Sequence, residues 1–426
     1  MRLSRWFMFM LVFASSGVVS GQEVESSELP PEKEKNLEWS GNLDTKYTLF
    51  HMDQNSAQYK LQFLNQSPSS SLLSQYRLEP YLNAEYRTGD LGFVLRTHAT
   101  YYSDADARFD LFETYGSFNP SFNVTLQAGK RMYSWGKGYA FNPVGFVNPI
   151  KDPENPELAQ AGLLSGNVEY IRSSQSDALQ SFALMFVVIP SSELLNGRYG
   201  EFEKTDIAVK TNFLLWDTDL DLMAYYGKDK PKRYGMDFAR NLKENLEIHG
   251  EISLNLNAPR YTILNDSIHI EPSDQLSSLF GIRYLTESNV TVIAEYYHNR
   301  LGLKRSEYEQ YANYLKKSAA GNSPSVVQQA LGVSQTYFRG STLMQDYLYV
   351  RITYPELFDW LYFTPALYTI YNLADNSFLL SLQMNYKPVT NVEFIFWPSA
   401  LVGGGQSEYG TKPVRERIEL WMRVYF

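Results

Sequence analysis

The connections between the predicted strands alternate between short and long along the chain. About eighteen segments have the alternation and the length of strands that can cross a bilayer. They are predicted near residues 37–50, 75–87, 91–102, 108–118, 122–133, 163–172, 178–190, 204–215, 218–228, 233–240, 245–256, 278–287, 290–300, 344–354, 361–373, 377–387, 391–400 and 414–426. Every second connection is short, and the long ones are 51–74, 134–162, 191–203, 257–277, 301–343 and 401–413. Such sorting is typical of a transmembrane antiparallel β-barrel with short periplasmic turns and long extracellular loops, and it predicts an all-β fold of 16–18 strands.

The last segment of the chain has one apolar and one polar face. From Ile418 to Phe426 every second residue is apolar, and the residues between them include Glu419 and Arg423. This period of two indicates a strand with one face in lipid. A terminal strand that ends on Phe426 resembles the assembly signal of bacterial outer-membrane barrels, and the resemblance implies the barrel-assembly machinery as a partner.

The start of the chain predicts export. Residues 2–14 combine two arginines with an apolar run too short to cross a bilayer, and small residues follow at 20–21. This pattern predicts a cleaved signal peptide over 1–21. Residues 22–36 are acidic and lack periodicity, so we expect a disordered periplasmic leader before a barrel over 37–426. With no cysteine, the chain can carry neither a lipoprotein anchor nor a disulfide.

Composition excludes several classes of function. A hydrophobic fraction of 44% and a mean hydropathy of -0.33 are too low for a helical membrane protein. Aromatic residues make up 15% of the chain, as expected when each strand crosses two headgroup girdles. The net charge of -9 argues against nucleic acid as a partner. The 5 histidines are scattered, so we expect no metal and no cofactor.

The same alternation places charged side chains of both signs on the inner wall. Leu246–Leu256 sets apolar residues against five polar ones, which need water or partners. The residues assigned to the inner face are Lys46, Arg77, Arg87, Arg96, Arg131, Lys210, Arg283, Arg351, Arg417, Arg423, Asp44, Glu79, Glu85, Glu113, Asp219, Asp221, Glu247, Glu251, Glu295, Glu393 and Glu419. The signs balance, so selectivity would come from local groups. Pairs that merely hold the wall together are the alternative.

The segment from Gly129 to Pro149 is the most motif-like part of the chain. It is crowded with glycine, Asn-Pro pairs and aromatic residues, which predict a rigid loop that folds into the barrel. Over residues 129–157 it resembles the Trp-Gly…Asn-Pro segment of alginate-export-type and related porin-like outer-membrane proteins. The resemblance implies a channel. Candidate constriction or substrate-binding residues are Arg131, Trp135, Lys137, Tyr139, Asn142 and Lys151, with Arg96, Arg351 and Arg423 on the wall. The loop lysines could instead pair with Asp152, Glu154 and Glu157.

Two further segments suggest alternatives to an open channel. In the connection 301–343, residues 308–320 have helical spacing and a second helix is expected near 326–331, so a helical hairpin could cover the barrel, or pack as an exposed loop. In the hairpin 278–300, Ser278 is expected opposite His298, with Asp346 on the next strand. That order is what nucleophilic attack on an ester needs, and it resembles the arrangement in outer-membrane phospholipase.

These observations favour a porin-like outer-membrane channel for passive diffusion or export of a small solute or polymer, narrowed by inward loops. A scaffold barrel that sheathes a periplasmic partner, such as a multihaem cytochrome or an export complex, is the second interpretation. A lipid hydrolase that uses Ser278, His298 and Asp346 is the third. Outer-membrane lipid and lipopolysaccharide are the expected surroundings, and a homotrimer is possible.

Overall fold

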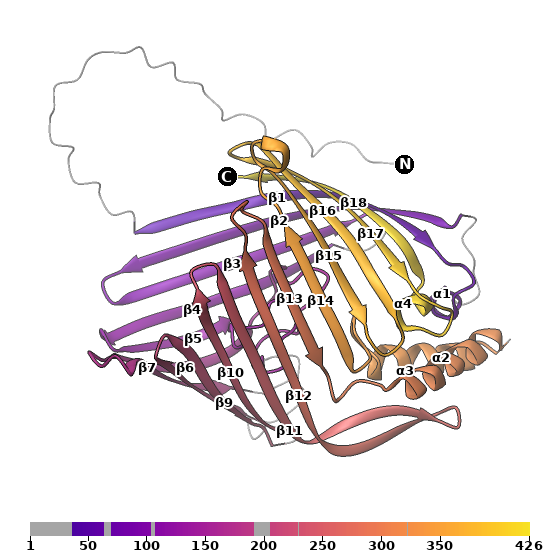
Figure 1. Cartoon of the computed structure of the whole chain (residues 1–426), viewed down its shortest axis with the longest axis horizontal. Coiled ribbons are helices and arrows are strands. Elements are labelled where there is room, and N and C mark those ends of the chain that lie inside the picture. Colours follow the sequence, from indigo (N-terminus) through magenta and orange to yellow (C-terminus); the bar gives the residue numbers. More distant parts are fainter. Residues whose placement is uncertain (1–35, 64–69, 104–106, 191–204, 229, 322) are drawn as a thin grey trace, which may run out of the picture. The chain divides into compact units, whose positions relative to one another are not determined.

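The barrel is closed by pairing between its first and last strands. The computed structural model describes residues 36–63, 70–103, 107–190, 205–228, 230–321 and 323–426. From Leu37 onward the chain forms an antiparallel β-barrel of 18 strands (Figure 1). Strand β1 (Leu37–Met52) pairs with β18 (Val414–Tyr425) on one side and with β2 (Leu72–Thr88) on the other. The predicted fold class and strand number are confirmed, whereas the expected signal peptide (1–21) and almost all of the leader (22–36) lie outside the described residues.

Each remaining strand pairs with its neighbours in the sequence. These strands are β3 (Leu91–Tyr102), β4 (Arg108–Ser121), β5 (Val124–Arg131), β6 (Leu163–Ser173), β7 (Leu179–Ile189), β8 (Asp206–Leu215), β9 (Thr218–Tyr226), β10 (Lys232–Lys243), β11 (Leu246–Leu264), β12 (Ser267–Leu285), β13 (Thr291–His298), β14 (Asp346–Thr353), β15 (Phe363–Asn372), β16 (Ser377–Val389) and β17 (Val392–Val402). The described helices are α1 (Ala57–Gln62), α2 (Arg305–Ala320), α3 (Pro324–Tyr337), α4 (Glu408–Thr411) and a 3₁₀ turn, η2 (Leu357–Asp359). Within these ranges no helix is long and apolar enough to cross a bilayer.

The two faces of the wall differ as the alternation predicts. On β18, Ile418, Leu420 and Met422 point outward and are exposed, while Glu419 and Trp421 point inward and are buried. Charged residues that the sequence assigned to the inner face and that are buried there are Asp44, Lys46, Glu79, Glu113, Asp221, Glu251, Glu295 and Glu419. The barrel therefore has an apolar exterior and a polar interior.

One predicted loop is instead part of a long hairpin. The sequence analysis treated 257–277 as a loop, but β11 and β12 stay paired up to Leu264 and Ser267 (Figure 1). Asn257 has a positive φ of 53°, and the register shifts between Asn255 and Ala258, which is a β-bulge. The bulge interrupts the period of two, so the pattern wrongly indicated that the strand had ended. Helices α1 and α4 were not predicted, because a single turn leaves almost no periodicity.

The aromatic side chain of Phe426 packs on the seam where the barrel closes. Its backbone exchanges hydrogen bonds with Gly41, at N···O distances of 3.1 and 3.0 Å. A Cβ atom on Gly41 would lie 2.5 Å from Cζ of Phe426, so the ring covers this glycine. The ring also packs against Trp39 on its exposed edge, with centroids 6.0 Å apart. The seam is thus stabilised by an aromatic pair on the outer surface.

We expect Phe426→Ala to lower the yield of folded barrel, because it uncovers Gly41 and removes the pair with Trp39. The yield is measured as the fraction of membrane-inserted protein that runs faster unheated than boiled on a detergent gel. Phe122→Ala is the matched control, because Phe122 is 99% exposed in a short turn. An equal yield for the two variants would show that the aromatic seam contact has no role in assembly.

Candidate functional site

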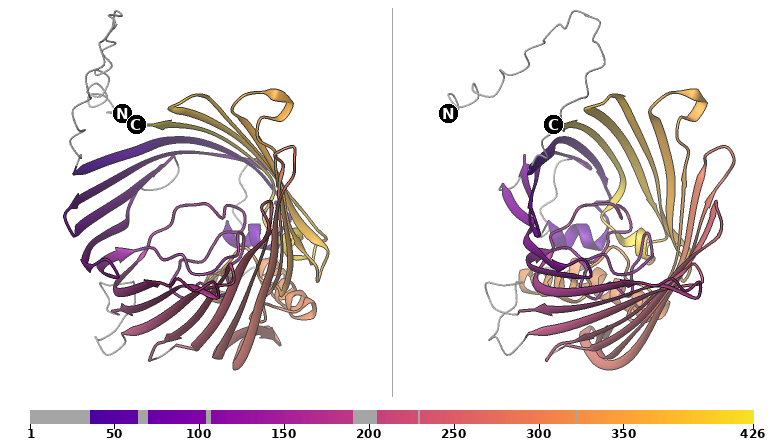
Figure 2. Two further views of the ribbon diagram at one scale, coloured as in Figure 1. Left: turned by 60° about the vertical axis from the view of Figure 1, so that its left-hand side comes forward. Right: turned by 90° about the vertical axis from the view of Figure 1, so that its left-hand side faces the viewer.

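The connection between β5 and β6 runs through the inside of the barrel. Figure 2 shows this segment, residues 132–162, within the ring of strands. Trp135, Ala140, Val144 and Val147 of this segment are each at most 2% exposed, which an outward loop would not achieve. The predicted inward fold of this segment, hereafter the inner loop, is confirmed.

Two buried carboxylates of the wall hold the backbone of the inner loop. Glu251 on β11 accepts hydrogen bonds from the N–H groups of Lys137 (2.7 Å), Gly138 (2.6 Å) and Val144 (3.2 Å). Glu295 on β13 accepts them from the N–H groups of Tyr139 and, at 2.9 Å, Ala140. Charged acceptors make strong hydrogen bonds to backbone amides, and these bonds offset the cost of burying the carboxylates. Alternation predicted that both glutamates face inward, but not what they bind.

The glycine and asparagine residues of the motif shape the start of the inner loop. Gly136 has a φ of +97°, and a Cβ atom there would lie 2.2 Å from Oδ1 of Asn142. Both reasons require glycine at this position. Asn148 exchanges two hydrogen bonds with the backbone of Trp135, at 3.1 and 2.8 Å, and Nδ2 of Asn142 donates to the carbonyl of Trp135. The Asn-Pro pairs therefore fix the turn around the buried tryptophan.

The inner loop is attached to opposite sectors of the wall. One side is an apolar cluster in which Trp135, Val144, Phe146 and Val147 pack against residues of β7, β8 and β9, namely Val187, Ile189, Ala208, Met223 and Tyr225. On the other side Arg417 of β18 forms an ion pair with Glu154 at 3.0 Å, and the hydroxyl of Tyr368 on β15 donates to the Glu154 carbonyl at 2.8 Å. The inner loop therefore crosses the lumen and leaves only part of it open.

The two candidate lysines of the inner loop are both engaged. Nζ of Lys137 lies 2.6 Å from Asp219 and 3.2 Å from Asp221. Burial lowers the pKa of Lys137, but the hydrogen bond to Asp219 and the charges of Asp221 and Asp237 outweigh burial and raise it. Nζ of Lys151 donates to the carbonyls of Gly138 and, at 3.3 Å, Tyr139, and burial lowers its pKa. The lysines therefore bind wall carboxylates and loop carbonyls rather than the acidic residues of the inner loop itself.

The other candidate residues are distributed around the wall. Arg423 binds Asp44 with two hydrogen bonds of 2.7 and 2.8 Å, and Arg96 forms an ion pair with Glu113. The guanidinium of Arg351 lies 6.0 Å from the ring of Tyr139, whose hydroxyl donates to Glu157 at 2.9 Å. Arg131 lies 5.1 Å from the ring of Tyr133 and also contacts Gln127. These side chains support the wall and the inner loop, and they do not gather at one place.

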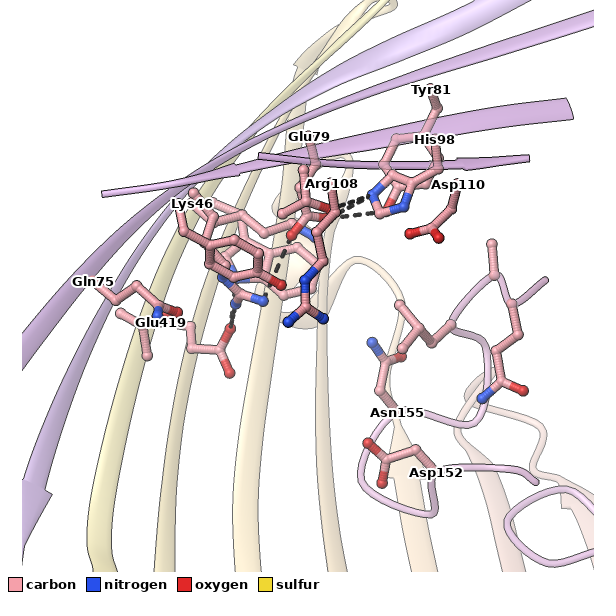
Figure 3. Close-up of a pocket in the computed structure, with 18 of the residues that line it drawn as sticks. Lys46, Gln75, Glu79, Tyr81, His98, Arg108, Asp110, Asp152, Asn155 and Glu419 are labelled. Carbon is pink, nitrogen blue, oxygen red and sulfur yellow. Dashed lines mark hydrogen bonds and ion pairs between the residues drawn. The ribbon is translucent and has the colours of Figure 1, made fainter. Parts of the chain in front are cut away.

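A cavity of about 490 Å³ lies between the inner loop and the wall formed by β1–β4, β17 and β18 (Figure 3). Wall residues Lys46, Glu79, His98, Arg108 and Asp110 line it, with Asp152 and Asn155 on the loop side. Burial and the neighbouring Glu154 raise the pKa of Asp152. Of these residues, the sequence analysis had placed Lys46 and Glu79 inside and had noted Asp152 only as a possible partner for the lysines. Period-two spacing on β3 and β4 could have found His98, Arg108 and Asp110, but β4 alternates poorly.

The second long connection forms the predicted helical hairpin at the long-loop end. Helix α2 begins at Arg305 and α3 at Pro324, close to the expected positions. Glu307 of α2 binds both terminal guanidinium nitrogens of Arg260 on the β11–β12 hairpin. Burial raises the pKa of Glu307, but the hydrogen bonds and the charge of Arg260 outweigh burial and lower this pKa. Tyr337 of α3 packs against Tyr261 with ring centroids 5.0 Å apart. The helices are therefore held on the hairpin that the sequence had presented as a loop.

The predicted pairing of Ser278 with His298 in the hydrolase alternative is confirmed, and Asp346 lies on the next strand as expected, but the serine makes no hydrogen bond to the histidine among the described residues. Ser278 pairs with His298 and His298 pairs with Asp346 across β12, β13 and β14. Nδ1 of His298 lies 2.8 Å from Oδ1 of Asp346, which also accepts the hydroxyl of Tyr296 at 2.7 Å. No hydrogen bond joins Ser278 to His298 in the described part of the chain. The group therefore has the orienting half of a catalytic triad without the contact that would activate the nucleophile.

Solved structures of outer-membrane porins share this architecture. No protein-family model matches the chain, and no curated protein matches it either. Pseudomonas aeruginosa OccK8 (OprE) is 10% identical, with a TM-score of 0.55 over 92% of this chain and 98% of that one. The chain has the fold of these porins. A BenF-like porin from Pseudomonas fluorescens Pf-5 is 9% identical with a TM-score of 0.52 over 92% and 99%. P. aeruginosa OccK2 (OpdF) in complex with glucuronate is 10% identical with a TM-score of 0.52 over 92% and 96%. The comparison confirms a porin-like barrel but not the alginate-export type.

Proposed function

We propose that this chain is a bacterial outer-membrane channel that passes a small solute down its gradient. The observation that carries the proposal is the inner loop, which crosses a closed barrel and leaves a cavity of about 490 Å³ lined by charged residues. A narrow polar passage inside an apolar-walled barrel suits selective diffusion. The porin fold supports the same conclusion, and one structure of that fold holds a sugar acid, which is of a size that suits this cavity.

The attachment of the inner loop favours a small solute over the alternatives. Export of a polymer such as alginate, or the sheathing of a cytochrome, needs a wide open lumen. Here Glu251, Glu295 and Arg417 hold the inner loop in place across that lumen from several sides. Displacing it would break charge-assisted hydrogen bonds in a buried setting, which is costly. A molecule of a few ångströms therefore suits this barrel better than a folded partner.

The cellular setting follows from the same proposal. A cleaved signal peptide would export the chain, and the barrel-assembly machinery would insert it through the strand that ends at Phe426. The long loops would then face the outside and the lipopolysaccharide, and the short turns would face the periplasm. A homotrimer stays a prediction. It is tested by measuring the size of the purified protein in detergent.

The function is tested by reconstitution. Protein that shows heat-modifiable mobility on a detergent gel is inserted into liposomes, and the rate of swelling is measured with glucose-sized solutes and with a large dextran. We expect swelling with the small solutes and none with dextran. A barrel that excludes the small solutes, or a chain that fractionates as a soluble protein, would contradict the proposal.

A further inference from the structure

Most charged residues around the cavity beside the inner loop neutralise one another. Lys46 binds Glu79 at 2.7 Å, Arg77 binds Glu419 at 3.2 Å, and Arg417 binds both Glu154 and Glu419 at 3.0 Å. These contacts leave the groups little free charge to offer a solute. Recognition must therefore come from the lining groups outside this set of pairs.

Three charged side chains that line the cavity have no ion pair among the described residues. They are Arg108 and Asp110 on β4 and Asp152 on the inner loop. The carboxylate of Asp152 accepts one hydrogen bond, from the backbone N–H of Glu154 at 3.1 Å. In Figure 3, Arg108 and Asp110 extend from the wall, and Asp152 lies across the cavity on the loop. Among the described residues the cavity thus presents one cation and one carboxylate from the wall and one carboxylate from the inner loop, each without an ion pair.

The spacing of these groups suits a molecule that carries both charges. Arg108 and Asp110 are two residues apart on one face of a strand, so their backbone positions are separated by about 7 Å. A carboxylate and an ammonium on the same carbon, each with a hydrogen bond of about 2.8 Å to its partner, span a comparable distance. A singly charged solute would satisfy only the lining groups of one sign and meet repulsion from those of the other sign.

We propose that the cavity binds a zwitterionic solute of amino-acid size, an inference that rests on the proposed channel function. Arg108 binds the carboxylate with its planar fork of donors, and Asp110 and Asp152 bind the ammonium. Beside them His98 stacks on the ring of Tyr81, with centroids 4.3 Å apart, and packs at a tilt against Phe112, with centroids 4.8 Å apart. This aromatic surface would contact an apolar side chain of the solute.

The test uses four probes that share the phenylalanine skeleton and carry different charges. Phenylalanine is the zwitterion, N-acetylphenylalanine the anion, phenylalaninamide the cation and N-acetylphenylalaninamide the neutral form. Each is added to single channels in a planar bilayer in potassium chloride, and the concentration that halves the current is measured. We expect the zwitterion to block at a concentration about tenfold below that of any other probe. Arg108→Gln and Asp152→Asn should each raise the blocking concentration of the zwitterion about tenfold.

A control variant and the possible results distinguish the zwitterion site from the channel function on which it rests. Arg172→Gln removes a positive charge from β6, outside the cavity, and should leave the block unchanged. Equal block by all four probes, or strongest block by the anion or the cation, would overturn the zwitterion site while the channel stands. A heat-modifiable protein with no single-channel current would overturn the channel function itself.

Discussion

Replacing Glu251 and Glu295 together by alanine is expected to raise the single-channel conductance several-fold. The two carboxylates accept three and two backbone N–H groups of the inner loop. Each hydrogen bond to a charged group contributes about 1.5–3 kcal/mol. Their combined loss is several kcal/mol, and it also leaves buried amides without acceptors. The inner loop should leave its place in the lumen, and the passage should widen.

The control for this experiment is Glu271→Ala. The Glu271 side chain lies on the β11–β12 hairpin, away from the inner loop, and is 68% exposed. Its removal should change neither conductance nor heat-modifiable mobility. Should the double variant fail to assemble, deletion of residues 136–160 with a short glycine linker makes the same measurement. An unchanged conductance in a folded loop-deleted barrel would show that the inner loop does not limit the passage.

Gly136→Ala is expected to displace the inner loop, because the added methyl group causes both backbone strain and a steric clash. The positive φ of +97° disfavours any residue with a Cβ, at a cost of order 1–3 kcal/mol. The added carbon would also lie 2.2 Å from Oδ1 of Asn142 and 2.7 Å from Oε1 of Glu251. We expect a larger and noisier conductance, together with trypsin cleavage after Lys137, whose side chain is held by Asp219 in the native loop.

Gly89→Ala separates backbone strain from the steric clash. Gly89 also has a positive φ, of +54°, but a Cβ atom there would have no atom within 4 Å. This variant should keep the native conductance and protect Lys137 from trypsin. Equal behaviour of the two variants would mean that the close approach of Asn142 and Glu251 to Gly136 is not needed to hold the inner loop.

Much of the barrel could be predicted because the alternation of apolar and polar residues can be identified within each strand separately. Alternation along β18 distinguishes the lipid face from the inner face without knowledge of any other strand. The pairing of Ser278 with His298 also followed from the turn position and alternation, whereas the long connection 301–343 left the register of Asp346 open. The β11–β12 hairpin was missed because the bulge at Asn257 reverses the alternation. A period-two pattern cannot show whether pairing resumes beyond such a break.

The candidate site was predictable only in part, because it depends on contacts across the lumen. The sequence indicated a rigid inward loop and an inward Glu251, but it could not show that the backbone of 137–144 binds this carboxylate. Lys137 was assigned to a pore entrance or to the loop's own acidic residues, whereas it pairs with Asp219 and Asp221 of β9. Asp219 and Asp221 are more than 80 positions from Lys137 in the sequence. A local sequence pattern cannot show which of several distant carboxylates a lysine will pair with.

The single-channel conductance of purified, heat-modifiable protein in a planar bilayer tests the central claim most directly. We predict discrete steps of current that are smaller than those of the barrel from which residues 136–160 are deleted. A protein that inserts as a folded barrel and yields no steps above the bare bilayer would contradict the account.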